Sequence, residues 1–402
     1  MRRLLIISSL IALLFSCSGC WEQKELNTTA IVTAWGVDLS VKQNGYLDFS
    51  AQLAQPGQPG ESGQIRAGNL VLTGTGLSIT ESARRIMLRL PRLPLWAQAS
   101  TCILGENLAL QDLTGFYNFA VRNRVIRPDT NLLIAKNATP ARILNTTMPL
   151  VSNSGRAFVV MEETQEKQLG IYVPVSLNDF LIDAATPGIE PAVPQVTLVA
   201  NPENPVNKIS QQENNQSQPG EKLILSGTAV FKGTKMVGSL DETESRGYRW
   251  LNSRIHKGGL ITMSSPLNPG ETISLEIIEF SSSSQPEFNQ GQITMKIEVS
   301  TGLTFYEEDG TSPILTPETR SLLQKQAAQE IQREITACIS KSQSLNSDIL
   351  GWGRTIYQNQ PHQWERLSPT WYQTFPHINS QIDVQVRVVR AGLDPKIFQF
   401  KE

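Results

Sequence analysis

The chain has 402 residues and a nearly balanced charge, with 35 Lys and Arg against 37 Asp and Glu. This length suffices for two or three domains, and a hydrophobic fraction of 40% is that of a globular protein able to bury a core in each. A net charge of −2 offers no basic field for phosphates, so nucleic acid is not an expected partner.

The N-terminus carries the pattern of a lipoprotein signal peptide. Arg2 and Arg3 form a basic start, an apolar run extends from Leu4 to Phe15, and two small residues precede Cys20. The apolar run is too short to cross a hydrocarbon core of ~30 Å. Small residues before a cysteine mark a site where the thiol receives diacylglycerol, and two acyl chains hold a protein stably on a membrane. We therefore predict a signal peptide over residues 1–19, lipidation of Cys20, and a folded part that faces away from the cytoplasm.

Two alternatives stay open for this segment. Cys17 has Leu14 at the preferred position but bulky Phe15 two residues before it, whereas Cys20 has Cys17 where a Leu is usual. The other alternative is a plain secretory signal, but no good Ala-x-Ala site follows the apolar run. The pattern favours Cys20. No second apolar stretch approaches transmembrane length, so the lipid is the expected membrane anchor.

Strands and helices alternate between residues 20 and 200, which predicts an N-terminal α/β domain. Apolar residues on both faces from Thr29 to Asp38 predict a doubly buried strand, and alternation predicts a half-buried strand from Tyr46 to Leu53. The further expected elements are a helix capped by Ser78 with Ala83, Ile86, Met87 and Leu90 on its apolar face, a strand from Ala99 to Leu104, a helix between Leu110 and Val121, and a strand from Asn131 to Ala135.

Residues 201–222 contain almost nothing to bury, which predicts a flexible polar linker. Such a segment is the expected first site of proteolysis, and a cut there is expected to leave two folded fragments. The block from 223 to 402 is predicted to be α+β, with a possible division near 263–269. Its expected elements are strands at Leu223–Phe231, Ile273–Phe280, Ile293–Val299 and Ile382–Val389, and a long helix after Thr316 with the buried stripe Leu323, Ala327, Ile331, Ile335 and Ile339.

Signals for catalysis, metal binding and cofactor binding are missing. The histidines His256, His362 and His377 form no metal-binding spacing, and no Cys-x-x-Cys occurs. Gly74-Thr75-Gly76 lacks the third glycine of a dinucleotide site and is interpreted as a turn entering a helix. The acidic runs Glu162-Glu163 and Glu307-Glu308-Asp309 do not indicate two carboxylates that face one substrate. We therefore predict no enzyme, no catalytic, metal or cofactor-binding residue, and no cofactor.

The two cysteines of the body and the aromatic residues near the C-terminus have structural interpretations. Cys102 and Cys338 are expected to be buried free thiols, because one distant pair makes no disulfide framework. The densest aromatic cluster is expected to close a small core beneath the long helix, with docking of a partner at its rim as the alternative. It comprises Trp352, Tyr357, Trp364, Trp371, Tyr372 and Phe375.

Several segments resemble those of Ger(x)C spore germination lipoproteins. The mature start is similar in Gly19-Cys20-Trp21-Glu22-Gln23-Lys24-Glu25-Leu26-Asn27 and in the strand that ends in Gly36-Val37-Asp38. Further similar segments are Glu106 to Ala109, Phe119 to Arg122, Asn131 to Ala141, Ser226 to Lys232, Met236 to Gly238, Glu244, Trp250-Leu251, and Asp348 to Gly353 with Pro361, Trp364 and Trp371. Cys17, Trp35 and the long linker depart from the family pattern.

The resemblance implies a fold of three α/β domains and the role of the C subunit of a spore germinant receptor. Such a subunit would be non-catalytic and anchored through the diacylglycerol on Cys20. It would lie on the outer face of the spore's inner membrane beside the A and B membrane subunits. Two other classes stay open, a substrate-binding lipoprotein of an importer and a cell-wall enzyme. The importer protein would need a cleft between two similar lobes, and the enzyme would need an acid pair, nucleophile or metal set.

Overall fold

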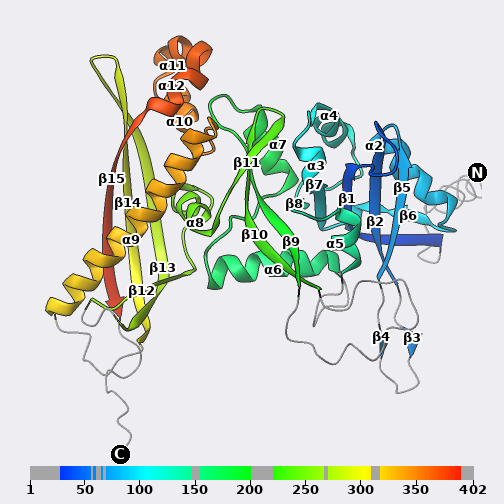
Figure 1. Ribbon diagram of the computed structural model, residues 1–402, viewed down its shortest axis with the longest axis horizontal. Helices are drawn as coiled ribbons and strands as arrows, with labels where there is room; N and C mark the ends of the chain where they lie inside the picture. Colours follow the sequence, from blue (N-terminus) through cyan, green and yellow to red (C-terminus); the bar gives the residue numbers. More distant parts are fainter. Residues whose placement is uncertain are drawn as a thin grey trace, which may run out of the picture.

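The computed structural model describes residues 28–55, 58–59, 65–66, 69–146, 154–200, 221–266, 270–308 and 317–390. The predicted signal peptide, Cys20 and all but the last two residues of the predicted linker lie outside this part of the chain. The described residues form two large β-sheets with packed helices, arranged side by side in an elongated molecule (Figure 1), and a separate two-stranded ribbon. The predicted α+β class, with mixed and antiparallel pairing, is confirmed.

The first sheet has nine strands within the described residues, in the order β11-β10-β9-β8-β7-β1-β2-β5, and β6 pairs with β1. The four central strands β1, β7, β8 and β9 are parallel to their neighbours among these four. The pairs β1–β2, β2–β5, β9–β10 and β10–β11 are antiparallel. The strands are β1 (Thr29–Leu39), β2 (Leu47–Ala54), β5 (Asn69–Gly76), β6 (Leu93–Leu95), β7 (Thr101–Gly105), β8 (Asn131–Ala135), β9 (Ala192–Ala200), β10 (Glu221–Lys232) and β11 (Lys235–Leu240), and a separate ribbon joins β3 (Gln58–Pro59) to β4 (Ile65–Arg66).

Helices cover both faces of this sheet, which explains why its central strands are apolar throughout. One face packs on α5 (Pro140–Asn145) and α6 (Ser154–Gln168), through Leu144 and Phe158. The other face packs on α2 (Ile79–Arg85), α4 (Thr114–Arg122) and α7 (Leu177–Ala185), through Ile79, Phe116 and Phe180. Short helices α3 (Glu106–Ala109), η2 (Ile86–Leu88) and η3 (Trp96–Gln98) complete the layer.

The first strand and the cap of the first helix confirm the predictions for them, but the helix is shorter than predicted. It ends at Arg85, and Met87 of the predicted apolar face is 42% exposed because a 3₁₀ turn follows. Residues Val32 to Val37 are all buried. The Trp35 ring stacks on Phe49 with 5.4 Å between their centroids, so the indole of Trp35 fills this face of the sheet. Ser78 caps α2 by accepting a hydrogen bond from the Glu81 backbone amide. The interpretation of Gly74-Thr75-Gly76 as a turn is wrong. These residues end strand β5, and a Cβ on Gly74 would lie 2.1 Å from the Ser82 carbonyl oxygen of α2.

The sheet continues across the predicted linker, which changes the expected independence of the two blocks. Strand β10 follows residues 201–220 and pairs antiparallel with β9, which precedes them, from Glu221 opposite Ala200 to Val230 opposite Ala192. The break between sheets lies instead between β11 and β12 (Leu260–Ser264), where α8 (Glu242–Leu251) connects them. The suggested division near 263–269 begins within β12, which pairs with β13 in the second sheet.

The second sheet has the order β12-β13-β14-β15 among the described residues, with β13 (Thr272–Asn289), β14 (Gln292–Glu308) and β15 (Asn379–Arg390). The pairing of β13 with β14 is antiparallel, whereas β14 and β15 are parallel. Helix α9 (Pro317–Ser344) crosses one face of this sheet (Figure 1), and its five predicted stripe residues are all buried. The predicted inward residues of β15 alternate with exposed ones from Ile382 to Val388.

The aromatic cluster packs at the upper end of α9, as the core interpretation predicts. Its elements are α10 (Trp352–Asn359), α11 (Pro361–Leu367), η5 (Ser368–Thr370), α12 (Trp371–Thr374) and η6 (Phe375–His377). Trp352, Trp364, Trp371 and Phe375 are buried, with ring centroids of successive contacting pairs 5.2 to 6.1 Å apart. Burying one such ring stabilises a fold by roughly 2 to 3 kcal/mol, so this cluster is a core.

Candidate functional site

The groups weighed in the sequence as possible metal ligands or acids lie apart in the structure. No group of three or more His, Cys, Asp or Glu among them could hold a metal ion. His362 is exposed on α11, and Glu162 is buried while its neighbour Glu163 pairs with Lys167 at 3.6 Å on the surface. Cys102 and Cys338 are buried free thiols, as predicted. The two sheets are held together by a set of contacts that we call the joint. It is formed by α7, the segment after α8, the β10–β11 hairpin and α10.

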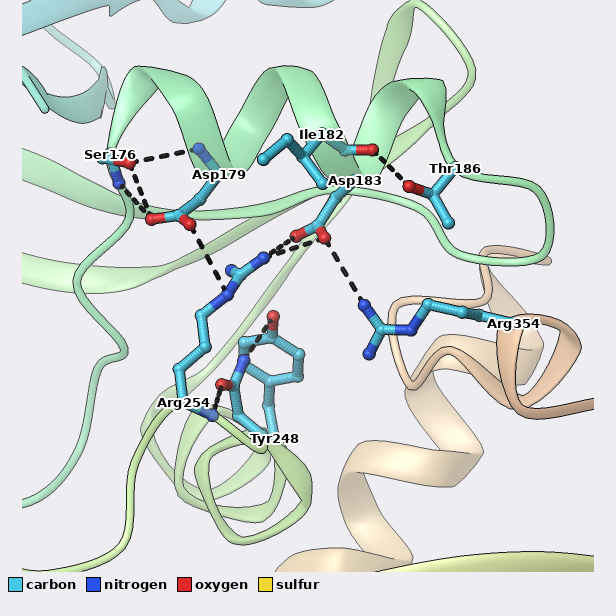
Figure 2. Close-up of polar contacts among 9 residues, drawn as sticks. Ser176, Asp179, Ile182, Asp183, Thr186, Tyr248, Arg254 and Arg354 are labelled. Carbon is cyan, nitrogen blue, oxygen red and sulfur yellow. Dashed lines mark hydrogen bonds and ion pairs between the residues drawn. The ribbon is translucent and has the colours of Figure 1, made fainter. Parts of the chain in front are cut away.

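An ion-pair cluster ties α7 of the first sheet to the segment after α8 (Figure 2). The Arg254 Nη2 donates hydrogen bonds to both carboxylate oxygens of Asp183 at 2.8 Å, and its Nε lies 3.7 Å from Asp179. Arg354 of α10 approaches Asp183 from the other side at 3.7 Å (Figure 2). Burial raises the pKa of Asp183, and the guanidinium of Arg254 opposes that rise. The cluster thus joins three elements from three parts of the chain.

Local sequence explains why α7 presents these carboxylates. Ser176 and Asp179 form a reciprocal capping box, in which the Ser176 Oγ accepts from the Asp179 amide at 3.1 Å and Asp179 accepts from the Ser176 amide at 3.1 Å. Asp183 lies four residues beyond Asp179, so both side chains occupy one helix face. The cap therefore fixes the start of the helix and the direction in which both carboxylates point.

A second polar contact joins the β10–β11 hairpin to the aromatic cluster. The buried carboxylate of Glu190 accepts from the Tyr372 hydroxyl at 2.5 Å and from the Gly233 amide at 2.7 Å. The Lys232 ammonium lies 4.4 Å from the centroid of the Tyr372 ring. The Glu190 amide donates to the backbone carbonyl of Asp348 at 2.9 Å, so backbone and side chain of one residue contact the C-terminal segment.

Asp348 organises the start of α10. Its carboxylate accepts from the amides of Trp352 at 3.1 Å and Gly353 at 2.8 Å, and from the Trp371 indole at 3.2 Å. Burial raises the pKa of Asp348 to about 7, while these donors oppose the rise. A Cβ on Gly353 would lie 2.7 Å from the Cα of Gly188, so the two backbones meet at a distance that only glycine allows.

The third polar contact of the joint is made by Arg249 of α8. Arg249 is 1% exposed and donates to Glu166 of α6 at 3.2 Å and to the carbonyls of Lys257 at 2.8 Å and Gly258 at 2.6 Å. Between the polar contacts lies a shared apolar cluster drawn from both halves, which comprises Val173, Ala192, Val230, Leu240, Tyr248, Cys338 and Ile349. A joint that is buried, paired and apolar at its centre favours one relative placement of the two sheets.

An open pocket of about 810 Å³ lies elsewhere, beside α2 and α4 of the first sheet. Leu77, Ile79, Phe116 and Phe119 are among its apolar lining residues, and Arg122 is among its polar ones. The pocket belongs to one sheet and its helices, and it is not a cleft between two similar lobes. It therefore lacks the architecture expected for the binding protein of an importer.

Each half of the chain matches a family model of spore germination proteins. The family model described as "Spore germination protein N-terminal domain" matches residues 22–198. The model described as "Spore germination B3/ GerAC like, C-terminal" matches residues 226–392. The chain belongs to the Ger(x)C family.

Two relatives align with this Ger(x)C chain over all or nearly all of its length. It is 23% identical over 416 residues to spore germination protein KC of Bacillus subtilis (strain 168), covering 100% of this chain and 99% of the relative. It is 20% identical over 404 residues to the putative spore germination protein YfkR of the same strain, covering 96% of each chain. The crystal structure of the GerBC protein matches with a TM-score of 0.53 at 16% identity, covering 92% of this chain and 100% of the other, which shows the same fold.

The residues that carry the Ger(x)C resemblance have structural roles in this fold. Asp38 is the second-last residue of β1, and its carboxylate accepts from the Leu108 amide at 3.3 Å. The carboxylate lies so close to Gly105 that a Cβ added there would be 1.9 Å from its carbon atom. Gly353 and Asp348 build the joint. The ion pair of Arg254 with Asp183 was not among the predicted features, because its partners are far apart in the sequence and neither stands in a local motif.

Proposed function

We propose that this Ger(x)C protein is the lipid-anchored C subunit of a spore germinant receptor. The observation that supports this proposal best is that the two family models cover nearly all of the chain from residue 22 to residue 392, immediately after the predicted lipidation site at Cys20. In this role the chain is tethered to the spore's inner membrane on its outer face, and it assembles with the A and B membrane subunits.

The subunit acts in this proposal by binding and positioning, not by catalysis. Charged side chains cluster at the joint, where the contacts of Arg254 with Asp183 and of Glu190 with Tyr372 hold the two sheets in one arrangement. A receptor subunit needs such a scaffold because several of its surfaces must contact membrane partners at the same time. Among the described residues, no helix combines the length and the apolar character needed to cross a bilayer.

A complementation experiment tests the anchor and the role together. Spores that lack the gene are complemented with the wild-type chain, with Cys20→Ala and with the matched control Cys17→Ala. We expect the wild-type and Cys17→Ala chains to fractionate with the inner membrane and to restore nutrient-triggered germination. The Cys20→Ala chain is expected to be lost from the membrane and to leave germination impaired, because two acyl chains are needed for stable attachment. Intact-mass detection of diacylglycerol on Cys17 would contradict the assignment.

A further inference from the structure

The link between α2 and β6 exposes apolar and basic side chains together. This segment, residues 84–93, exposes 42% of Met87, 82% of Leu88 and 60% of Leu93. Its arginines Arg84 and Arg92 are exposed as well. Single exposed apolar residues are common on proteins, but several within seven successive positions indicate a contact surface.

The region around this segment has a net positive charge. Between Ser78 and Trp96 there are four arginines and a single acidic residue, Glu81. That carboxylate is already engaged, since it accepts from the Arg85 Nε at 2.9 Å and from its Nη2 at 2.7 Å. Arginine pairs well with phosphate, and an exposed apolar residue between arginines can enter the boundary between headgroups and acyl chains. The combination therefore fits an anionic lipid surface.

The chain enters the fold at the same place. Thr29 at the start of β1 pairs with Leu93, and Ala30 pairs with Pro94. Only residues 21–27 separate Cys20 from the first described residue, Thr28. Because an extended chain spans at most about 3.6 Å per residue, an anchor on Cys20 would keep this entry point within roughly 30 Å of the membrane. The segment 84–93 thus lies where a tethered molecule would approach its bilayer.

We propose that segment 84–93 is a second membrane contact that lies on anionic lipid headgroups. Met87, Leu88 and Leu93 enter the interface, and Arg84 and Arg92 contact phosphates. The orientation that follows rests on the proposed lipid anchor, because two attachment points are needed to fix it. The end of the molecule formed by α2 and β6 faces the bilayer, and the four-stranded sheet, at the opposite end, points away from it (Figure 1).

Vesicle binding by the mature chain without its lipid tests the proposal separately from the anchor. The chain of residues 21–402 is sedimented with vesicles of phosphatidylglycerol and phosphatidylcholine, and with vesicles of phosphatidylcholine alone. We expect binding to the anionic vesicles that weakens as salt is added. Arg84→Gln with Arg92→Gln should lower the partition coefficient about thirtyfold, since each basic residue near an anionic surface contributes about fivefold. Leu88→Ser should lower it further.

The control carries the same charge change at the other end of the molecule. Arg320→Gln with Arg366→Gln, on α9 and α11, should leave vesicle binding unchanged, and all variants should keep the wild-type circular dichroism. Failure of the mature chain to bind anionic vesicles, or equal binding after the loss of Arg84 and Arg92, would overturn the proposal. So would loss of receptor assembly in Leu88→Ser with vesicle binding intact, since that assigns the segment to a protein partner. Loss of the Cys20→Ala chain from spore membranes tests the anchor and not this surface.

Discussion

Removing the guanidinium of Arg254 should destabilise the whole protein and not one sheet alone. The Asp183 side chain is 5% exposed, and its carboxylate receives two hydrogen bonds of 2.8 Å from Arg254. In Arg254→Met, the one cation left near it among the described residues would be Arg354, at 3.7 Å. Removing one partner of a buried pair costs about 3 to 5 kcal/mol, and because the Arg254 side chain is 30% exposed, we expect the lower end, about 3 kcal/mol.

The reverse change should cost less, which makes a double-mutant cycle informative. In Asp183→Asn, the guanidinium of Arg254 keeps Asp179 at 3.7 Å and access to water, so we expect a loss of about 1 to 2 kcal/mol. The double variant should lose less than the sum of the single ones, with a coupling energy of at least about 1.5 kcal/mol. As a matched control, Arg333→Met removes an exposed partner of Glu330 and should cost less than about 0.5 kcal/mol.

Urea unfolding of the mature chain measures these free energies. Circular dichroism follows both sheets, and tryptophan fluorescence follows rings in the hydrophobic core beside each sheet, such as Trp35 and Trp352. The shared apolar cluster predicts coincident transitions for the two signals. A loss below about 0.5 kcal/mol in Arg254→Met, or additive single variants, would refute the reasoning that this cluster holds the sheets together.

Three further predictions test buried groups and the course of the chain. Burial raises the pKa of Glu162 from 4.5 to about 8, so its native form binds a proton that the unfolded chain releases, and stability from this group falls as pH rises from about 5 to about 8. Glu162→Gln should remove up to about 3 kcal/mol of that pH dependence, measured as unfolding free energies at the two pH values. Gly188→Ala should cost at least about 3 kcal/mol, because the new Cβ would lie 2.3 Å from the Gly353 carbonyl carbon, whereas Gly233→Ala, also at positive φ but with nothing within 4 Å, should cost only about 1 kcal/mol. Trypsin cleavage at Lys208 should leave both fragments in one complex, because β9 and β10 stay paired across the cut, and separate elution of the fragments on size exclusion would contradict this.

Much of the fold could be predicted because its elements carry local periodic patterns. The doubly buried strand β1 and the stripe of α9 are visible as apolar runs with a fixed period, and burial in the structure follows them. The aromatic cluster is visible as six rings between residues 352 and 375, and four of these rings are buried together in the structure. In each case the information lies within a few residues of the element.

The joint could not be predicted because its partners lie far apart in the chain. Asp183 and Arg254 belong to different blocks of the sequence, and each is an ordinary charged residue until the fold brings them together. The polar composition of residues 201–222 suggested a boundary, yet pairing of β9 with β10 depends on the strands on either side of that segment. Glu162 and Glu163 look equivalent in sequence, but only one of them points into the core.

Affinity purification from spore inner membranes tests the central claim most directly. A C-terminally tagged chain is solubilised in mild detergent, purified, and analysed by mass spectrometry for its N-terminal modification and for its partners. The proposed function predicts diacylglycerol on Cys20 and both membrane subunits of a germinant receptor in the same complex. An unmodified chain, or a chain that brings down the components of a transport ATPase in their place, would contradict the claim.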